Sequence, residues 1–201
     1  MSLFPMFVKL EGRTCLVVGA GAVAQSKIES LLQAGAKVRV VALAAAESIQ
    51  NLAAQNLIVL WKKTFEPADL DGAFLVIAAT SSPDVNAAIF EQARLHNILC
   101  NSVDDPEHCD FYYPAVVRRG RLQFAISTEG QSPALAQRLR RELESRYGPE
   151  YEAWLDELGE ARQELFATEM NAEERRQKLH VLANGSPAKS ANSGVEAPHA
   201  R

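Results

Sequence analysis

Apolar runs alternate with amphipathic stretches along the first half of the chain. Five runs are rich in β-branched or other apolar residues, which predicts buried strands. These runs cover Thr14–Gly19, Val38–Leu43, Leu57–Trp61, Phe74–Ala79 and Ile98–Cys100. Apolar residues at helical spacing between them predict helices over Val23–Ala34, Ala45–Gln55 and about Pro83–His96. Strands that alternate with helices in this way are typical of an α/β domain with a parallel sheet.

The pattern changes after Asp110. Tyr113–Val117 and Leu122–Ser127 flank Arg118-Arg119-Gly120-Arg121, which predicts a hairpin. Ser132 and Pro133 then suit the cap and the first position of a helix. The apolar stripe expected on that helix consists of Leu135, Leu139 and Leu143.

Gly148-Pro149 ends that helix, and the charged stretch Glu150–Leu182 predicts further helix. Its expected packing residues are Trp154, Leu158, Leu165 and Phe166. The tail from Asn184 is small and polar and predicts disorder. We therefore expect a parallel-sheet domain over residues 1–112, a small α+β domain over 113–147, a helical domain over 148–183 and a disordered tail over 184–201.

Composition narrows the class of protein. The net charge of −4 gives no reason to expect nucleic acid or an anionic membrane as a partner. No apolar run reaches the length needed to cross a bilayer. The three cysteines, Cys15, Cys100 and Cys109, form no disulfide framework or paired motif, so a reducing cytoplasm is the expected location.

A glycine-rich turn joins the first predicted strand to the first predicted helix. Its sequence, residues 19–24, is GAGAVA, in which Gly19 permits a tight turn and Gly21 permits close approach of a pyrophosphate. The free N–H groups and positive dipole end of the helix favour phosphate. Dinucleotide binding is therefore favoured over a purely structural turn. The residues expected to bind the cofactor are Gly19, Gly21, Ala22, Val23, Ala42, Leu43 and Thr80.

One expected feature of an NAD site is missing from the second strand. Its end, Val41-Ala42-Leu43, offers no carboxylate for the adenosine ribose, which weakens the preference for NAD over NADP. Arg39 is a candidate for a 2′-phosphate, but its place within the strand makes that the lesser interpretation.

Six segments between residues 4 and 147 together resemble one family. They are Phe4-Pro5-Met6-Phe7, the run VVGAGAVAQSK that ends at Lys27, Ala78-Ala79-Thr80, Cys100-Asn101-Ser102-Val103-Asp104, Tyr113-Pro114-Ala115 and Ser127–Ala136. In order and spacing they resemble the precorrin-2 dehydrogenase/sirohydrochlorin ferrochelatase family, also found as the N-terminal half of siroheme synthases. This resemblance is far more specific than the glycine turn alone.

The resemblance implies a Rossmann-type domain, a central dimerisation domain and a small C-terminal helical domain in a homodimer. It implies NAD as the hydride acceptor and precorrin-2 as the substrate, with sirohydrochlorin as the product. Many members of the family then insert ferrous iron to give siroheme. Iron is therefore expected here as a possible substrate.

Asp104 matches the family's catalytic aspartate and would take the proton that leaves precorrin-2 with the hydride. The alternative from the residues alone is that Asp104 starts a turn, because Asp-Asp-Pro is good turn chemistry. The resemblance favours catalysis and leaves Asp105 as the turn residue.

Precorrin-2 carries many carboxylates, and the resemblance places Ser127, Thr128 and Ser132 near it. Arginine side chains suit carboxylates, and the second half of the chain offers Arg118, Arg119, Arg121, Arg138, Arg140, Arg141 and Arg146. For any single one, a solvated helix face is the more ordinary role. The acidic and thiol residues between 104 and 110 match no standard zinc spacing, so no tightly bound metal is expected.

Two other functions compete with a bifunctional enzyme. One is a dehydrogenase alone, with a separate chelatase elsewhere in the cell. The other is a non-catalytic NAD-sensing module. Asp104 and the segment Ser127–Ala136 argue against the sensing module.

Overall fold

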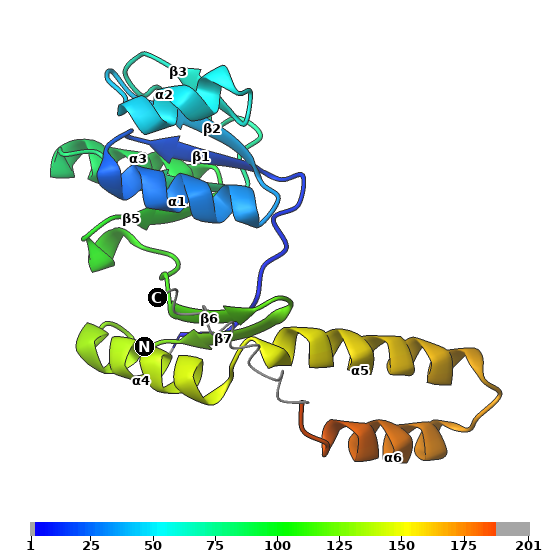
Figure 1. Ribbon diagram of the computed structural model, residues 1–201. Coiled ribbons are helices and arrows are strands. Elements are labelled where there is room, and N and C mark those ends of the chain that lie inside the picture. The colour runs from blue at the N-terminus through cyan, green and yellow to red at the C-terminus, as the bar shows by residue number, and fades with distance from the viewer. Residues whose placement is uncertain (1–2, 188–201) are drawn as a thin grey trace, which may run out of the picture. The chain divides into compact units, whose positions relative to one another are not determined.

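The computed structural model describes residues 3–187, so residues 188–201 of the predicted tail lie outside the described part. The chain forms two compact units. We call Phe4–Tyr113 the sheet unit, and the chain from Pro114 onward, which Leu3 joins, the hairpin–helix unit. Figure 1 labels the elements of both.

A five-stranded parallel sheet forms the sheet unit, in the order β3-β2-β1-β4-β5. The strands are β1 (Thr14–Val18), β2 (Lys37–Val41), β3 (Ile58–Trp61), β4 (Leu75–Ala78) and β5 (Leu99–Ser102). The helices are α1 (Ala22–Gln33), α2 (Glu47–Ala54) and α3 (Pro83–Leu95), with short 3₁₀ turns at Pro67–Leu70 and Pro106–His108. The predicted alternation of strands and helices, and the parallel α/β fold, are confirmed.

Helices cover both faces of this sheet. Side chains of α1 and α2, such as Ile28 and Ile49, pack against one face, and side chains of α3, such as Ile89, pack against the other. Every residue of β4 is buried, because this strand has a neighbour on each side and a helix layer on each face. That position explains why its sequence is apolar throughout rather than alternating.

The hairpin–helix unit begins with an antiparallel pair, β6 (Ala115–Arg119) and β7 (Leu122–Ile126). Helices α4 (Pro133–Arg146), α5 (Glu150–Ala167) and α6 (Ala172–Ala183) follow. The hairpin is confirmed, but its turn is shorter than predicted, because Arg118 and Arg119 belong to β6. Ser132 caps α4 as predicted, since its hydroxyl oxygen accepts a hydrogen bond from the Leu135 N–H at 3.2 Å.

The continuous helical stretch expected over Glu150–Leu182 is two helices. The chain breaks after Ala167, and Asn171 starts α6 by accepting a hydrogen bond from the Glu174 N–H at 2.9 Å. Asparagine competes for backbone hydrogen bonds in a helix interior and is favoured as a cap, which accounts for the break. Phe166 was expected to pack inside but is 52% exposed.

Little of the hairpin–helix unit is deeply buried. Leu135, expected on the apolar stripe of α4, is exposed, and Ala136 is the residue of α4 that is buried. Within the described part of the chain, α5 and α6 contribute no buried residue. Aromatic contacts link the elements instead. The rings of Phe124, Tyr147, Tyr151 and Trp154 contact one another in that order, with successive centroids 4.7, 5.1 and 5.6 Å apart.

No helix within residues 3–187 has the length and apolar character needed to cross a bilayer.

The sheet unit should depend on its central strand for stability. Ile77 of β4 is 0% exposed, and Ile77→Ala should lower the free energy of unfolding by about 2–5 kcal/mol because it leaves a cavity. Val59 of the edge strand β3 is 51% exposed, and Val59→Ala should cost less than about 0.5 kcal/mol. Urea unfolding followed by circular dichroism measures both, and equal losses would contradict this account of the core.

Candidate active site

The glycine turn lies where the sheet order reverses, between the ends of β1 and β4. Gly19 has a φ of +107°, and a Cβ built there would lie 2.2 Å from the carbonyl oxygen of Ala79. No side chain is tolerated at that distance, so a glycine is required for β1 to turn so close to β4. Open sheets of this kind bind ligands at such a reversal, beside the carboxyl ends of the strands.

Gly21 presents the opposite situation. It precedes α1, and a Cβ there would meet nothing within 4 Å, so the backbone is open on that side. Among the described residues, no side chain caps the N-terminus of α1, and its first turn holds no acidic group. The first N–H groups of the helix therefore remain available to an anion such as a pyrophosphate.

The other residues predicted to bind a cofactor lie along the same edge. Ala22 and Val23 open α1, while Ala42 and the exposed Leu43 follow β2. The two strand ends are tied together, since the Gly19 N–H donates to the Val41 carbonyl at 2.8 Å. The structure thus brings these residues together, though none of them is a carboxylate for a ribose. The side chain of Arg39 is engaged with the backbone instead of this edge, because its guanidinium donates to the Asp71 carbonyl at 2.7 Å.

Thr80 follows β4, and its polar groups are occupied within the protein. Its hydroxyl and its N–H both donate to Oδ1 of Asn86, at 2.7 and 3.2 Å, and Nδ2 of Asn86 donates to its carbonyl at 3.2 Å. Asn86 is only 5% exposed. Asn86 was not among the residues predicted from the sequence, although an amide side chain in the first turns of an amphipathic helix is a visible signal. Thr80 and Asn86 together fix the loop between β4 and α3.

Asp104 lies at the carboxyl end of β5, one residue after Val103. The Val103 N–H donates to the Ala78 carbonyl at 2.9 Å, so this end of β5 stays attached to β4. Asp104 has a φ of +61°, a left-handed conformation that aspartate and asparagine tolerate better than most residues. Its side chain is exposed, and no hydrogen bond or salt bridge of its carboxylate occurs within residues 3–187.

The neighbours of Asp104 in the loop are engaged with one another. Asp105 pairs with Nδ1 of His108 at 2.6 Å, and the turn expected at Asp105 falls instead on Val103 and Asp104. The carboxylate of Asp110 accepts the Cys100 N–H at 2.8 Å. The Cys109 thiol donates to the carbonyls of Ser102 and Asp105 at 3.1 and 3.2 Å. The loop is thereby fixed, and Asp104 is left facing solvent with its charge available.

The thiols of the sheet unit are unsuited to nucleophilic chemistry. Burial raises the pKa of Cys15 to about 11 and that of Cys100 to about 12, and it also raises the pKa of Cys109. A thiolate is the reactive form, and it is scarce at neutral pH when the pKa is so high. Over the described residues, no group of three or more His, Cys, Asp or Glu side chains has the arrangement of a metal site.

Lys27 of α1 is a further charged residue of the sheet unit. Its side chain is half-buried, and its Nζ lies 3.6 Å from the centroid of the Tyr113 ring. Burial lowers the pKa of Lys27, while the nearby carboxylate of Asp104 acts in the opposite direction. Lys27 and Asp104 are therefore close enough to interact.

Ser127, Thr128 and Ser132, predicted to contact a substrate, lie in the hairpin–helix unit. Each hydroxyl oxygen accepts a backbone N–H, from Glu129, Ser132 and Leu135 respectively. These bonds shape a tight loop, in which Glu129 and Gly130 have φ angles of +50° and +78°. Because each oxygen acts as an acceptor, its own hydrogen remains free to be donated to a ligand.

The arginines of this unit separate into two groups. Arg119 donates to the carbonyls of Tyr147 and Glu144, and Arg138 and Arg140 form salt bridges along α4. These side chains hold the unit together. Within residues 3–187, the guanidinium groups of Arg118, Arg121, Arg141 and Arg146 have no hydrogen bond or salt bridge, and that of Arg146 lies 5.7 Å from the centroid of the Tyr147 ring.

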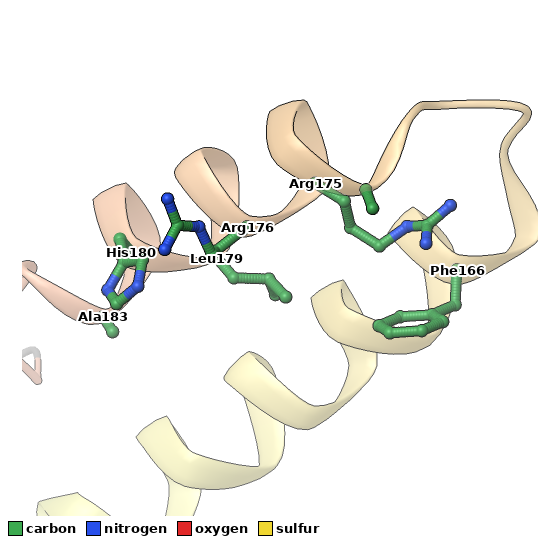
Figure 2. Close-up of a pocket in the computed structure, with 7 residues that line it drawn as sticks. Phe166, Arg175, Arg176, Leu179, His180 and Ala183 are labelled. Carbon is green, nitrogen blue, oxygen red and sulfur yellow. The ribbon is translucent and has the colours of Figure 1, made fainter.

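A pocket of about 580 Å³ lies between α5 and α6, and none of the predicted site residues lines it. Figure 2 shows Phe166 and Arg175 on its lining, where the guanidinium of Arg175 lies 4.5 Å from the centroid of the Phe166 ring. The same guanidinium donates to the carbonyls of Leu165 and Met170. These contacts join the two helices to each other.

Two family models match the chain. One is described as putative NAD(P)-binding and matches residues 6–115. The other is described as the central part of a sirohaem biosynthesis protein and matches residues 119–146.

Curated relatives and a solved structure are also similar to the chain. The siroheme synthase of Methylococcus capsulatus is 46% identical over 152 residues, which is 74% of this chain and 32% of the relative. Siroheme synthase 1 of Pectobacterium atrosepticum is 48% identical over 148 residues, or 72% and 30%. The chain thus spans about a third of these relatives. A structure described as SirC, precorrin-2 dehydrogenase, aligns with a TM-score of 0.77 and 29% identity, over 90% of this chain and 89% of that one.

The open backbone at Gly21 should be essential for the dinucleotide but not for the fold. Gly21→Asp would place a carboxylate where the pyrophosphate is expected, and the empty space around it means that folding should survive. We expect NAD binding to be lost in isothermal titration calorimetry, with an unchanged circular dichroism spectrum. The wild-type chain should bind NAD more tightly than NADP. Unchanged NAD affinity in Gly21→Asp would remove this turn from the cofactor site.

Proposed function

The chain belongs to the family of precorrin-2 dehydrogenases that also forms the N-terminal part of siroheme synthases, and on that premise we propose that it oxidises precorrin-2 to sirohydrochlorin with NAD. The observation that supports this most directly is Asp104. It is a carboxylate without a partner in the described structure, at the same sheet edge as the glycine turn. A base and a dinucleotide site on one edge are what a dehydrogenation requires.

The reaction removes a hydride and a proton from the reduced macrocycle. We assign the proton to a carboxylate oxygen of Asp104, which is exposed and has no competing hydrogen bond among the described residues. The surrounding bonds of Asp105, His108 and Asp110 hold the loop in place, so the base is positioned before the substrate arrives. Asp104 thereby serves as the general base.

The residues along the sheet edge fit a dinucleotide. Gly19 lets the chain turn against β4, and the open backbone of Gly21 and the free N–H groups of α1 would hold the pyrophosphate. Ala22 and Val23 would lie beside it, Ala42 and Leu43 beside the adenosine, and Thr80 next to the reversal of the sheet. NAD bound there supplies the acceptor for the hydride.

In the hairpin–helix unit we assign the substrate contacts to Ser127, Thr128 and Ser132. The loop that carries them is rigid, because their oxygens are fixed by backbone N–H groups. Each hydroxyl retains a hydrogen that can be donated to a carboxylate of the tetrapyrrole.

We further propose that the chain inserts ferrous iron into sirohydrochlorin, with iron as a substrate. Iron entry releases two pyrrole N–H protons, and Asp104 is the carboxylate placed to accept protons at this edge. A chain that only oxidises precorrin-2 would keep the first reaction and lack the second. A non-catalytic NAD-sensing module would lack both.

Removing the charge of Asp104 should stop the dehydrogenation without changing the fold. Asp104→Asn is the suitable variant, because asparagine tolerates the φ of +61° and alanine does not tolerate it as well. We expect kcat for precorrin-2 oxidation, followed by NADH absorbance, to fall about 10²- to 10⁴-fold. NAD affinity should be unchanged, and iron insertion should slow as well.

A matched control lies in the same loop. Glu107 is an exposed carboxylate, and Glu107→Gln removes the same charge while it leaves the proposed base intact. Its rate should match the wild type. Wild-type rates in Asp104→Asn would end the catalytic assignment, and intact iron insertion in that variant would mean that the two reactions use different bases.

We also propose a homodimer held by the hairpin–helix unit, in a cytoplasmic protein whose three thiols are free. A two-stranded hairpin and helices with so few buried residues make a weak core when they are alone. A second copy would supply the missing packing.

Assembly can be tested directly. Multi-angle light scattering at micromolar concentration should give twice the mass of one chain, and a chain that ends after Tyr113 should lose the dimer. A monomeric full chain would contradict the proposal.

A further inference from the structure

Lys27 belongs to a motif whose role the proposed chemistry leaves open. It lies on α1, six residues after Gly21, and its half-buried side chain reaches the face of Tyr113. The Nζ atom lies 3.6 Å from the ring centroid, which is a close cation–π contact. The contact restricts where the ammonium group can be.

The charge of Lys27 has no paired counterion. The carboxylate of Asp104 is near enough to influence it, yet no salt bridge of Lys27 occurs among residues 3–187. Lys63 of the same unit shows the usual arrangement, because its Nζ binds Glu66 at 2.9 Å and Asp69 at 2.8 Å. A partly desolvated ammonium group without an anion is unfavourable unless an anion arrives.

The position of Lys27 suits a contact with the substrate rather than with the adenosine. Ala42 and Leu43, at the end of β2, are the residues assigned to the adenosine. Asp104 follows β5, which is an outermost strand of the sheet. β5 lies two strands from β1, on the side away from β2. Lys27 contacts the Tyr113 ring, and the chain before Tyr113 is tied to β5 by the hydrogen bond from Nδ2 of Asn101 to the Phe111 carbonyl at 2.8 Å, so Lys27 lies towards that second side.

We propose that Lys27 binds a carboxylate of the tetrapyrrole and so holds the macrocycle beside Asp104. The inference rests on the proposed function, since it takes the substrate to be a polycarboxylate. Tyr113 keeps the ammonium group in place, and Asp104 stays free of a direct ion pair that would occupy the base. Lys27 is then a cationic contact that the sheet unit supplies.

Two substitutions separate charge from packing. Lys27→Met keeps a long apolar side chain against the Tyr113 ring and removes the charge. We expect the Kd for sirohydrochlorin, measured by fluorescence quenching, to rise about 10- to 100-fold, as for the loss of a hydrogen bond to a charged group. KM for precorrin-2 should rise in parallel, with a smaller change in kcat and the same NAD affinity. Lys27→Arg should restore most of the binding, because guanidinium also stacks on aromatic rings.

The control is Lys37→Met. Lys37 is exposed at the start of β2, at the opposite end of the strands, so its loss changes the net charge equally and should leave the Kd unchanged. Wild-type Kd in Lys27→Met overturns the proposal, and so does a fall in kcat with unchanged Kd and KM.

The outcome for the wild-type chain separates this inference from the function on which it rests. A wild-type chain that binds sirohydrochlorin but does not oxidise precorrin-2 overturns the proposed function alone, and the Kd values still decide the role of Lys27. A wild-type chain that binds no sirohydrochlorin overturns both.

Discussion

The approach of β1 to β4 at Gly19 is the constraint on which the cofactor edge depends. A Cβ at this residue would lie 2.2 Å from a backbone oxygen of Ala79, so the chain can turn there only without a side chain. The turn directs α1 back across the sheet and leaves the first N–H groups of the helix beside the sheet reversal. The buried, entirely apolar β4 holds the other side of this contact fixed. The proposed dinucleotide site thus results from backbone packing, and few polar side chains contribute to it.

The loop around Asp104, which follows β5 at the same edge, is held by polar contacts rather than by close backbone packing. Around Asp104, almost every polar group is used to hold another: Asp105 with His108, Asp110 with the backbone of Cys100, and the Cys109 thiol with two carbonyls. The loop that these bonds fix holds Asp104 exposed in a left-handed conformation. If Asp104 is the base, as proposed, it is fixed in advance and needs no reorganisation when a substrate binds. Lys27 adds charge to this side without consuming the carboxylate.

The sequence predicted the sheet unit well because its strands are apolar runs and its helices have a clear period. The predicted bounds of β1, β4 and α3 agree with the structure to within about two residues, and the glycine turn occupies the expected junction.

The sequence predicted less where the outcome depends on contacts between distant residues. The hydroxyl of Thr80 is taken up by Asn86, and Lys27 meets Tyr113, although neither pair shares a local pattern. Phe166 was expected to be buried because it is apolar, yet α6 meets that ring with the guanidinium of Arg175 and leaves it 52% exposed. The break at Asn171 carried a visible signal, since asparagine is a good cap.

The scarcity of buried side chains in α5 and α6 has a consequence for how stability is distributed along the chain. Local opening of a segment costs little when few apolar contacts are lost, whereas opening β4 exposes a strand whose residues are all buried. In native-state hydrogen exchange, the amides of α5 and α6 would therefore exchange through small local fluctuations, and those of β1 and β4 only through unfolding of the sheet. A protease would find its first cleavage sites around the Thr168–Asn171 connection, and the dinucleotide-binding fragment would outlast the helices that follow it.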